Sequence, residues 1–260
     1  MRLPTTAELL QVWEHARRQP PFQQALLLLG AALPDCSAEE LLRLSLGRRD
    51  LFLLELRALL FGLPCQSLTQ CPRCAAPVEL SFSLEPWRAA DKLLTAECNE
   101  FALEAEGYCV QGRWPNSADL ASLWQTMGWQ TTGAALDEAA ARNHLLERCV
   151  TAITRNDGQP AESPLATAVP VLVSDAIANQ LAEAAPQSDI QLAVDCPACR
   201  HQWIEFFDIG AWLMAEINDW AQRLLREVHA LALAYHWRES DILLMSATRR
   251  RAYLELLGRA

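Results

Sequence analysis

The sequence contains the stretches "CPRC" at 71–74 and "CPAC" at 196–199, which have the same form and lie far apart. A Cys-x-x-Cys turn places two thiolates on one side of a tight turn, near the roughly 2.3 Å that a zinc ion requires. Two such turns complete a tetrahedral site. The long segment between them is no obstacle, because the entropy of closing a loop grows slowly with its length. We therefore predict one structural Zn²⁺ site formed by Cys71, Cys74, Cys196 and Cys199.

The residues beside both turns have the pattern of short strands. "VELSFSL" (78–84) alternates apolar and polar residues, and "DIQLAVD" (189–195) and "HQWIEFFD" (201–208) enclose the second turn. Strands around paired Cys-x-x-Cys turns are the layout of a zinc ribbon, here split by a long insertion. Three alternatives stay open: two unrelated turns with buried thiols, His201 as a substitute ligand, and a redox pair, although a redox Cys-x-x-Cys normally opens a helix.

The residue after each turn departs from the usual pattern. Such turns commonly end in a glycine with left-handed backbone conformation, whereas Ala75 and Arg200 occupy these positions. A left-handed residue with a side chain costs roughly 1 kcal/mol. This cost is small beside the binding free energy of a structural zinc ion.

Helices are predicted for most of the remaining chain, so the fold class is mixed α/β and mostly helical. The first 65 residues have helical periodicity throughout, with two capping boxes, Thr5 with Glu8 and Ser37 with Glu40. The insertion is predicted to contain a hairpin at 100–114 that turns at Glu106-Gly107, followed by helices at 117–128, 136–155 and 174–185.

The chain from 209 to 237 is predicted to form one long amphipathic helix, followed by two short ones. Its apolar stripe comprises Leu213, Ile217, Trp220, Leu224, Val228, Leu231 and Tyr235. Residues 240–251 ("SDILLMSATRRR") also resemble residues 39–50 ("EELLRLSLGRRD"): both indicate a short helix, a serine cap and an arginine-led helix. Shared capping chemistry and a true structural repeat explain this likeness equally well.

These patterns predict helical N-terminal and C-terminal parts joined by a split zinc ribbon of short antiparallel strands with a long α/β insertion. The predicted segments are 1–65 (helical subdomain), 66–84 (first half of the ribbon), 85–188 (inserted hairpin and helical region), 189–208 (second half of the ribbon) and 209–260 (long helix plus two short helices).

Composition and charge exclude several classes of function. The net charge of −10 and a pI of about 5.0 disfavour nucleic-acid binding, since an acidic chain repels the phosphate backbone. The N-terminus lacks the layout of a signal peptide, and no apolar run is long enough to cross a bilayer. We therefore expect a cytoplasmic protein, in a bacterial or phage-infected cell, with reduced thiols and no membrane partner.

No catalytic pattern accompanies the cysteines. Four thiolates fill the zinc coordination sphere and leave no position for water or substrate, which is typical of a structural site. HExxH, GxxxxGK[ST], GxGxxG and GxSxG motifs are absent from the sequence. The sequence therefore predicts no enzymatic activity and no small-molecule substrate.

Candidate partner-binding residues lie in the C-terminal part. Trp and Arg dominate the energetics of protein interfaces, and both are frequent in this part of the chain. We therefore predict a partner surface that includes Trp212, Trp220, Trp237, Arg249, Arg250 and Arg251. The alternative, that these residues simply pack the helical end together, carries equal weight.

Several stretches together resemble a known family. They are "LSLGRRDLFLLELRALLFG" (44–62) followed by "CPRC", "RWPNSADL" (113–120), "LLERCV" (145–150), "APQSDIQLAVDCPAC" (185–199), and the segment from "CPACRHQW" through "TRRRAYLELL" (196–257). They resemble the baseplate hub assembly proteins of T4-like phages and their relatives in phage-derived contractile injection system loci.

The resemblance implies a non-enzymatic structural or chaperone-like component of baseplate assembly. Its implied partners are baseplate hub, spike or tail proteins, and its incorporation into a tail-like particle is left open. Two rival functions remain: a zinc-ribbon nucleic-acid-binding or transcription factor, which the acidic charge disfavours, and a thiol oxidoreductase, which would require a depressed thiol pKa.

Overall fold

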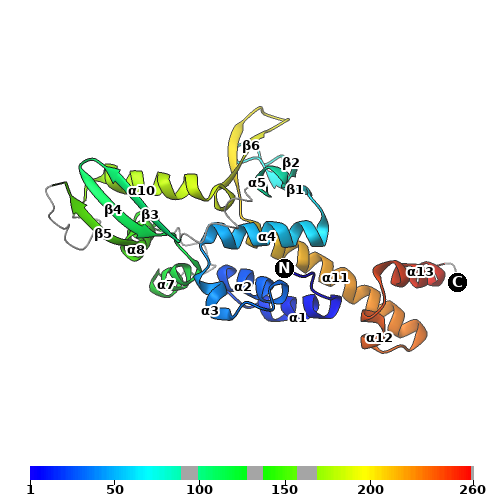
Figure 1. Ribbon diagram of the computed structural model, residues 1–260. Helices are drawn as coiled ribbons and strands as arrows, with labels where there is room; N and C mark the ends of the chain where they lie inside the picture. Colours follow the sequence, from blue (N-terminus) through cyan, green and yellow to red (C-terminus); the bar gives the residue numbers. More distant parts are fainter. Residues whose placement is uncertain (89–98, 128–136, 157–168, 259–260) are drawn as a thin grey trace. The chain divides into compact units, whose positions relative to one another are not determined.

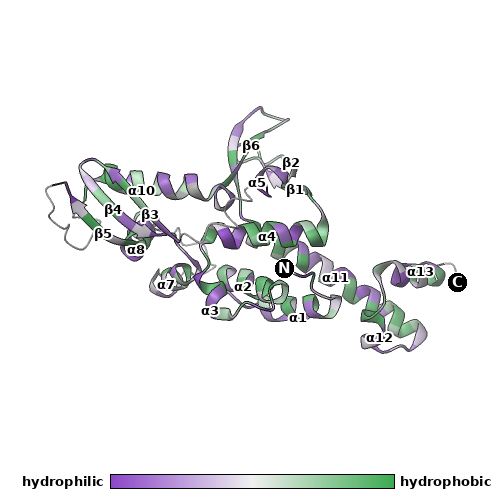
Figure 2. Cartoon of the chain, viewed as in Figure 1, coloured by the Kyte–Doolittle hydropathy of each residue, from purple (hydrophilic) through white to green (hydrophobic). Residues whose placement is uncertain are grey.

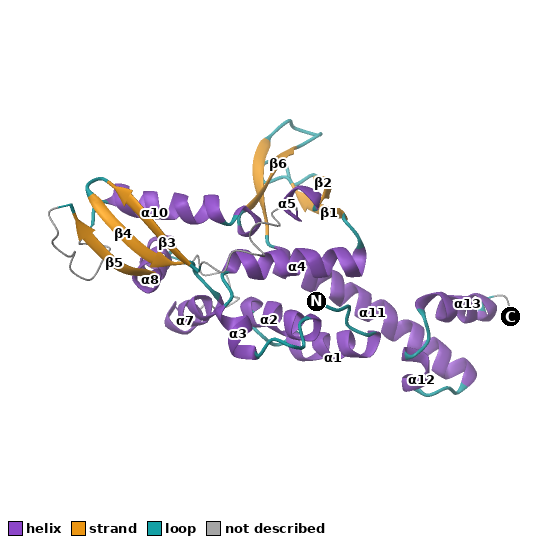
Figure 3. Cartoon of the chain, in the orientation of Figure 1, coloured by secondary structure: helices purple, strands orange, loops and turns teal. Residues whose placement is uncertain are grey.

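The computed structural model describes residues 1–88, 99–127, 137–156 and 169–258 (Figure 1). The chain divides into two compact units, one of Met1–Cys36 with Ile209–Ala260 and one of Ser37–Asp208. All described strands belong to the second unit (Figure 3). The protein is mixed α/β and mostly helical with small antiparallel sheets, which confirms the predicted class.

The first unit is helical. It consists of α1 (Thr6–Ala16), α2 (Pro21–Ala32), α11 (Ile209–Tyr235), α12 (Glu239–Leu243) and α13 (Ala247–Leu257). Thr5 and Glu8 form the predicted capping box at the start of α1, and α1 and α2 both pack against α11. Within this packing the Trp13 Nε1–H donates to Asn218 Oδ1 at 3.1 Å.

Helix α11 is amphipathic as predicted, and hydrophobic and hydrophilic residues interchange along it (Figure 2). Its buried face comprises Ile209, Gly210, Leu213, Met214, Ile217, Ala221, Leu224, Val228 and Leu231. The short helices α12 and α13 pack against the same helix. The stripe predicted from the sequence is therefore a core stripe, with Trp220 and Tyr235 only partly buried.

The second unit contains the remaining elements. Its helices are α3 (Ala38–Arg43), α4 (Leu46–Phe61), α5 (Glu85–Arg88), α7 (Ser117–Met127), α8 (Glu138–Cys149), α10 (Val171–Ala184) and the 3₁₀ turn η1 (Pro186–Ser188). Its sheets are β1 (Pro64–Gln70) with β2 (Pro77–Ser83), β3 (Glu100–Ala105) with β4 (Tyr108–Arg113) and β5 (Val150–Arg155), and β6 (Ile190–Asp195) with β7 (Gln202–Phe207).

The three-stranded sheet corrects one prediction. The hairpin of β3 and β4 turns at Glu106 and Gly107, as expected. The helix predicted over 136–155 instead ends at Cys149, and Val150–Arg155 pairs with β4 as strand β5. This segment, "VTAITR", is rich in β-branched residues, which favour strands. The edge of β4 provides the neighbouring strand with which it pairs.

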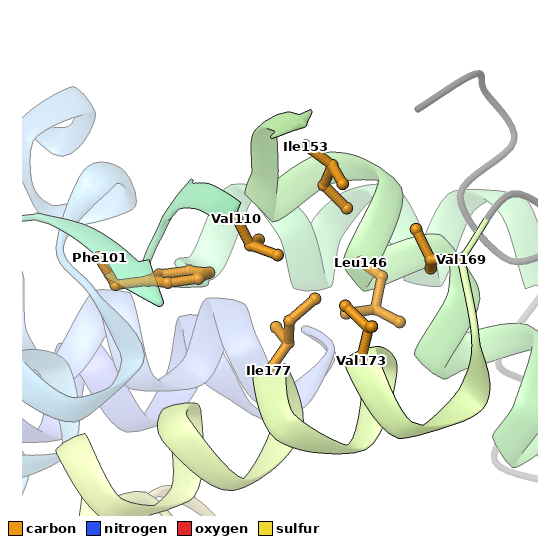
Figure 4. Close-up of a cluster of buried hydrophobic side chains, with 7 residues drawn as sticks. All are labelled: Phe101, Val110, Leu146, Ile153, Val169, Val173 and Ile177. Atoms are coloured by element: carbon orange, nitrogen blue, oxygen red, sulfur yellow. The ribbon is translucent and has the colours of Figure 1, made fainter. Parts of the chain in front are cut away.

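The sheet and two helices enclose an apolar core of their own (Figure 4). Its buried residues are Phe101, Val110, Leu146, Ile153, Val169, Val173 and Ile177. Beside it the Asp119 carboxylate is fully buried and accepts bonds from Arg113 at 2.7 Å and from Arg148 at 2.8 Å. This part of the unit is therefore held by apolar burial and by an ion-pair network around one buried carboxylate.

The segments 39–50 and 240–251 fold alike, each within its own unit. Ser45 caps α4 and Ser246 caps α13 by accepting from the backbone N–H three residues later. Four residues after each cap lies a buried arginine, Arg49 or Arg250. The repeat seen in the sequence is therefore a repeat of local structure.

Candidate metal centre

Each Cys-x-x-Cys turn closes a two-stranded hairpin with the same backbone bonds. In the turn between β1 and β2, Ala75 N–H donates to Cys71 C=O at 2.9 Å and Cys71 N–H donates to Ala76 C=O at 3.0 Å. In the turn between β6 and β7, Arg200 donates to Cys196 and Cys196 donates to His201, both at 2.9 Å. The two turns are thus near copies of each other.

Strand β1 was not predicted. The sequence pattern predicts helix up to residue 65, but α4 ends at Phe61 and Gly62 has a φ of 87°, which turns the chain out of the helix. The inward side of β1 carries Cys65, Ser67 and Thr69. Because two of these three residues are polar, the strand lacks the apolar alternation that reveals β2.

The fold brings all four predicted cysteines together. The Sγ atoms of Cys71 and Cys199 lie 3.7 Å apart, and those of Cys74 and Cys196 lie 3.6 Å apart. All four Sγ atoms lie within 4.8 Å of one another. A tetrahedron with metal–sulfur bonds of 2.3 Å has sulfur–sulfur edges of about 3.8 Å, so the cluster could hold one metal ion.

The first cysteine of each turn is buried and the second is more accessible. Cys71 is 2% exposed and Cys196 is 1% exposed, whereas Cys74 is exposed and Cys199 is half-buried. The site therefore lies at the rim of the two hairpins, where an ion can enter from one side. His201 is not a member of the four-sulfur group, and its ring stacks on Trp203.

The pKa values of the Cys71 and Cys74 thiols shift in opposite directions. Burial raises the pKa of Cys71, but donors from the Cys74 and Arg73 backbone and from neighbouring thiols outweigh it and bring the pKa to about 7. For Cys74, a backbone donor from Ala76 lowers the pKa, but bonds to the neighbouring sulfurs and burial raise it to about 12. A divalent cation would replace these protons, since metal ligands must be thiolates.

The hairpins face each other beyond the cysteines. Val78 and Val194 pack with Cys71 and Cys196 in one buried cluster. Thr69 donates to the Glu205 carboxylate at 3.3 Å, and the same carboxylate accepts from Trp203 Nε1 at 3.0 Å. The sequence does not predict this polar link, because no spacing rule connects Thr69 to Glu205.

The backbone at Ala75 and Arg200 is left-handed. Their φ angles are 57° and 58°. Glycine is the usual residue at both positions, so the backbone strain predicted from the sequence is present at both. The two turns therefore adopt a conformation that a residue with a side chain does not favour.

The predicted partner residues occupy different environments in the first unit. Trp212 and Trp220 are half-buried on α11. Trp237 is half-buried and stacks on Tyr235 with ring centroids 4.5 Å apart. Arg249 and Arg251 are exposed.

Arg250 differs from its two neighbours. It is 4% exposed, and its guanidinium donates to Glu227 at 2.9 Å and to the Met245 carbonyl at 2.7 Å. This arginine therefore ties α13 to α11, and its guanidinium is not presented to a partner in this structure.

The chain is similar to a known family over well over half of its length. The family model for the T4 bacteriophage base plate protein matches residues 23–213. No curated protein and no solved structure matches the chain. The four cysteines lie inside the matched range, whereas Trp220, Trp237 and the arginines of α13 lie outside it.

Proposed function

The chain belongs to the T4 bacteriophage base plate protein family, and from that premise we propose that it is a non-enzymatic structural or assembly component of a baseplate. The single observation that supports this function most is the family match over residues 23–213. The partners are other proteins of the baseplate or tail, such as hub or spike proteins, in a phage or in a phage-derived contractile injection system. A chaperone-like role during assembly belongs to the same proposal.

The proposed metal is zinc, with a structural role. Four thiolates at tetrahedral spacing match the ligand set that zinc prefers, and they leave no open coordination position. When bound, the ion would fix the two hairpins to each other at one end. A closed site of this kind supports scaffolding rather than hydrolysis.

The proposed partner surface is the exposed end of α11 with α12 and α13. It displays Leu244, which is 86% exposed, and Leu256, which is 55% exposed. Arg249 lies over the Tyr253 ring at 5.8 Å, beside the stacked pair of Tyr235 and Trp237. Exposed leucines, clustered aromatic rings and arginines form the composition of interface hot spots.

This surface is best tested by point substitution. Deleting residues 209–260 would remove α11 and with it the core of the first unit, so loss of binding would be uninformative. The double variant Arg249→Glu/Arg251→Glu changes only exposed charges. Arg223→Glu/Arg226→Glu on α11 makes the same charge change at two other exposed arginines.

The experiment is co-purification of the intact protein with the products of neighbouring tail and baseplate genes. We expect the α13 variant to lose a baseplate partner that the wild type and the α11 variant retain. Retention by both variants would contradict the proposed surface, and capture of no baseplate protein by the wild type would contradict the function. Recovery of the protein in purified particles would distinguish a resident component from a chaperone.

No observation favours the nucleic-acid-binding alternative over this proposal. None of the helices in the described ranges could cross a bilayer. A salt-dependent filter-binding measurement tests the nucleic-acid alternative directly, because phosphate contacts weaken steeply as salt rises. We expect no retention at low salt, in keeping with the net charge of −10.

A further inference from the structure

The junction of α3 with α4 and the junction of α12 with α13 are two copies of one local structure (Figure 1). We call residues 43–50 the first elbow and residues 244–251 the second elbow. The serine at the centre has φ and ψ angles of −57° and 148° in the first elbow and of −61° and 151° in the second. Because the backbones match, the first N–H of α4 and the first N–H of α13 occupy the same place in their elbows.

The first elbow binds an extended segment of its own unit. The Leu46 N–H donates to the Pro115 C=O at 2.8 Å, and Ser45 forms an antiparallel bridge with Asn116. The first amide of a helix has no acceptor within the helix. The extended segment therefore satisfies a donor that α4 itself leaves free, and Ser45 is buried.

A second segment of the same unit contacts the first elbow one turn further along α4. A Cβ atom added at Gly47 would lie 2.8 Å from the Ala185 Cβ, so the two backbones approach closely. The Ser188 hydroxyl donates to the Asp50 carboxylate at 2.7 Å. The first elbow is thus occupied by two different segments.

The second elbow has no such occupant among the described residues. Ser246, Ala247 and Thr248 are all exposed. The Ala247 N–H corresponds to that of Leu46, and within the described ranges nothing accepts a hydrogen bond from it. Leu244 is 86% exposed at the same elbow. The second elbow therefore presents the donor that the first elbow uses, together with an exposed apolar side chain.

A charge difference between the elbows indicates the chemistry of an occupant. Asp50 accepts a hydroxyl in the first elbow, whereas the corresponding residue of the second elbow is Arg251. A guanidinium only donates, and it bonds most strongly to a carboxylate. Arg249 adds a second exposed cation beside it. An occupant of the second elbow should therefore carry carboxylates.

A size difference indicates how the occupant lies. Gly47 permits the close approach of Ala185, whereas the corresponding residue of the second elbow is Thr248. The threonine side chain occupies the space that this approach requires. The occupant should therefore lie as Pro115 and Asn116 do, in an extended conformation across the start of the helix.

We propose that the second elbow binds an extended acidic segment of another baseplate protein. A backbone carbonyl of that segment accepts from the Ala247 N–H, and its carboxylates pair with Arg249 and Arg251. Extended segments commonly bind through backbone hydrogen bonds of this kind. A polypeptide fits better than a nucleic acid, because Leu244 offers an apolar contact beside the cations. The proposal rests on the proposed baseplate function and adds the way in which the partner binds.

The first test removes only the backbone donor. Proline is tolerated at the first position of a helix, and Ser246 has the extended backbone that a residue before proline requires. Ala247→Pro should therefore keep the melting temperature of wild type but bind the baseplate partner about tenfold more weakly, since a hydrogen bond is lost. Ala247→Val, which has a side chain of similar size and keeps the N–H, should bind like wild type. Pull-down of neighbouring tail and baseplate gene products, titrated against the concentration of the intact protein, measures the difference.

The same substitution in the first elbow serves as a comparison. Leu46→Pro removes an N–H that is bonded to Pro115. Its melting temperature should therefore lie about 2–4 °C below that of Leu46→Ala. Equal melting temperatures would show that this bond is not formed in solution. The first elbow would then offer no template for a partner, which would overturn the proposal.

The second test identifies the segment that binds. A photo-cross-linking residue at position 248, in the second elbow, is compared with one at position 223, an exposed position on α11. Mass spectrometry of the product from position 248 should identify a baseplate protein segment rich in Asp and Glu, which position 223 does not capture. Cross-linking to a second copy of this chain, to nucleic acid or to a segment without carboxylates overturns the proposal.

Failure of this proposal can be told apart from failure of the baseplate function. If Ala247→Pro retains a baseplate partner with wild-type affinity, the binding mode is wrong and the function stands. Equal weakening by Ala247→Pro and Ala247→Val also overturns the assigned hydrogen bond. Capture of no baseplate protein by the wild type overturns both the function and the binding mode.

Discussion

The second unit contains two regions of small antiparallel sheet that are held together by different means. The β3–β4–β5 sheet lies against α8 and α10 and buries a core of seven apolar residues. The two cysteine hairpins share a smaller buried cluster of Cys71, Val78, Val194 and Cys196. Two-stranded hairpins are marginal alone in water, so we expect the second region to depend on its four cysteines where the first depends on side-chain burial.

This difference predicts which substitutions each region should tolerate. Removing apolar volume should weaken the first region and leave the hairpins in place. Removing a thiolate should have the opposite effect. Positive φ angles at residues with a side chain occur in both regions, at Ala75 and Arg200 in the cysteine hairpins and at Glu106 in the turn between β3 and β4.

The largest expected effect is on the hairpins. Cys71→Ser should abolish metal binding and separate the two hairpins, because structural zinc sites have apparent binding free energies of about 10–16 kcal/mol. Elemental analysis and proteolysis within 64–83 and 190–207 measure both effects. Cys36→Ser, at an exposed cysteine outside the cluster, is the control. Full metal content in Cys71→Ser would contradict the site.

A smaller but still large effect is expected at the buried carboxylate beside the β3–β4–β5 sheet. Asp119→Ala leaves Arg113 and Arg148 without their partner, but both guanidinium groups are about a third exposed, so we expect a loss of about 1.5–3 kcal/mol in the free energy of unfolding. Asp175→Ala, which breaks the exposed pair with Arg142, should cost at most about 1 kcal/mol. Equal losses in urea denaturation would contradict the assignment of Asp119 as a buried anchor.

The same carboxylate makes stability depend on pH. Burial raises the pKa of Asp119, but bonds from Arg113, the Asn116 backbone and Arg148 outweigh it and hold the pKa below its ordinary value. The stability that it contributes is therefore complete above the unfolded-state pKa of about 3.9 and is lost as pH falls through the lowered folded-state pKa. Asp119→Ala should flatten this part of the curve of unfolding free energy against pH.

Truncating the apolar core should affect only its own region. Ile177 is 1% exposed in that core, so Ile177→Ala should cost about 2–5 kcal/mol. Val171→Ala on the same helix, at a residue that is 72% exposed, should have almost no effect. Metal content should stay at the wild-type value in both variants. Loss of metal in Ile177→Ala would show that the two regions fold as one cooperative element.

The smallest effect concerns the strained turns. Ala75→Gly and Arg200→Gly should each raise the unfolding free energy by up to about 1 kcal/mol, because glycine adopts a positive φ without strain. Ala76→Gly, at a neighbouring residue without a positive φ, should instead destabilise. Thermal unfolding of the metal-loaded protein measures the difference. Destabilisation by all three substitutions would show that the strain is absent in solution.

Local chemistry made much of the fold predictable. The capping boxes at Thr5 and Ser37, the hairpin turn at Glu106-Gly107 and the stripe of α11 each depend on residues a few positions apart. The errors at β1 and β5 arose where a strand carries polar inward residues or directly follows a helix. In both cases pairing with a neighbouring strand decided the structure, and that neighbour is not visible in the local pattern.

The sequence alone identified the four cysteines that come together, because two Cys-x-x-Cys turns between strands have few other uses, and it identified the amphipathic helix, because periodicity is a local property. Only the tertiary structure decided that Arg250 is buried while Arg249 and Arg251 are exposed, and that Ser45 is buried while Ser246 is exposed. The reason is physical: ligand spacing and helical period are set by bonds along the chain, whereas exposure depends on which distant segment covers a residue.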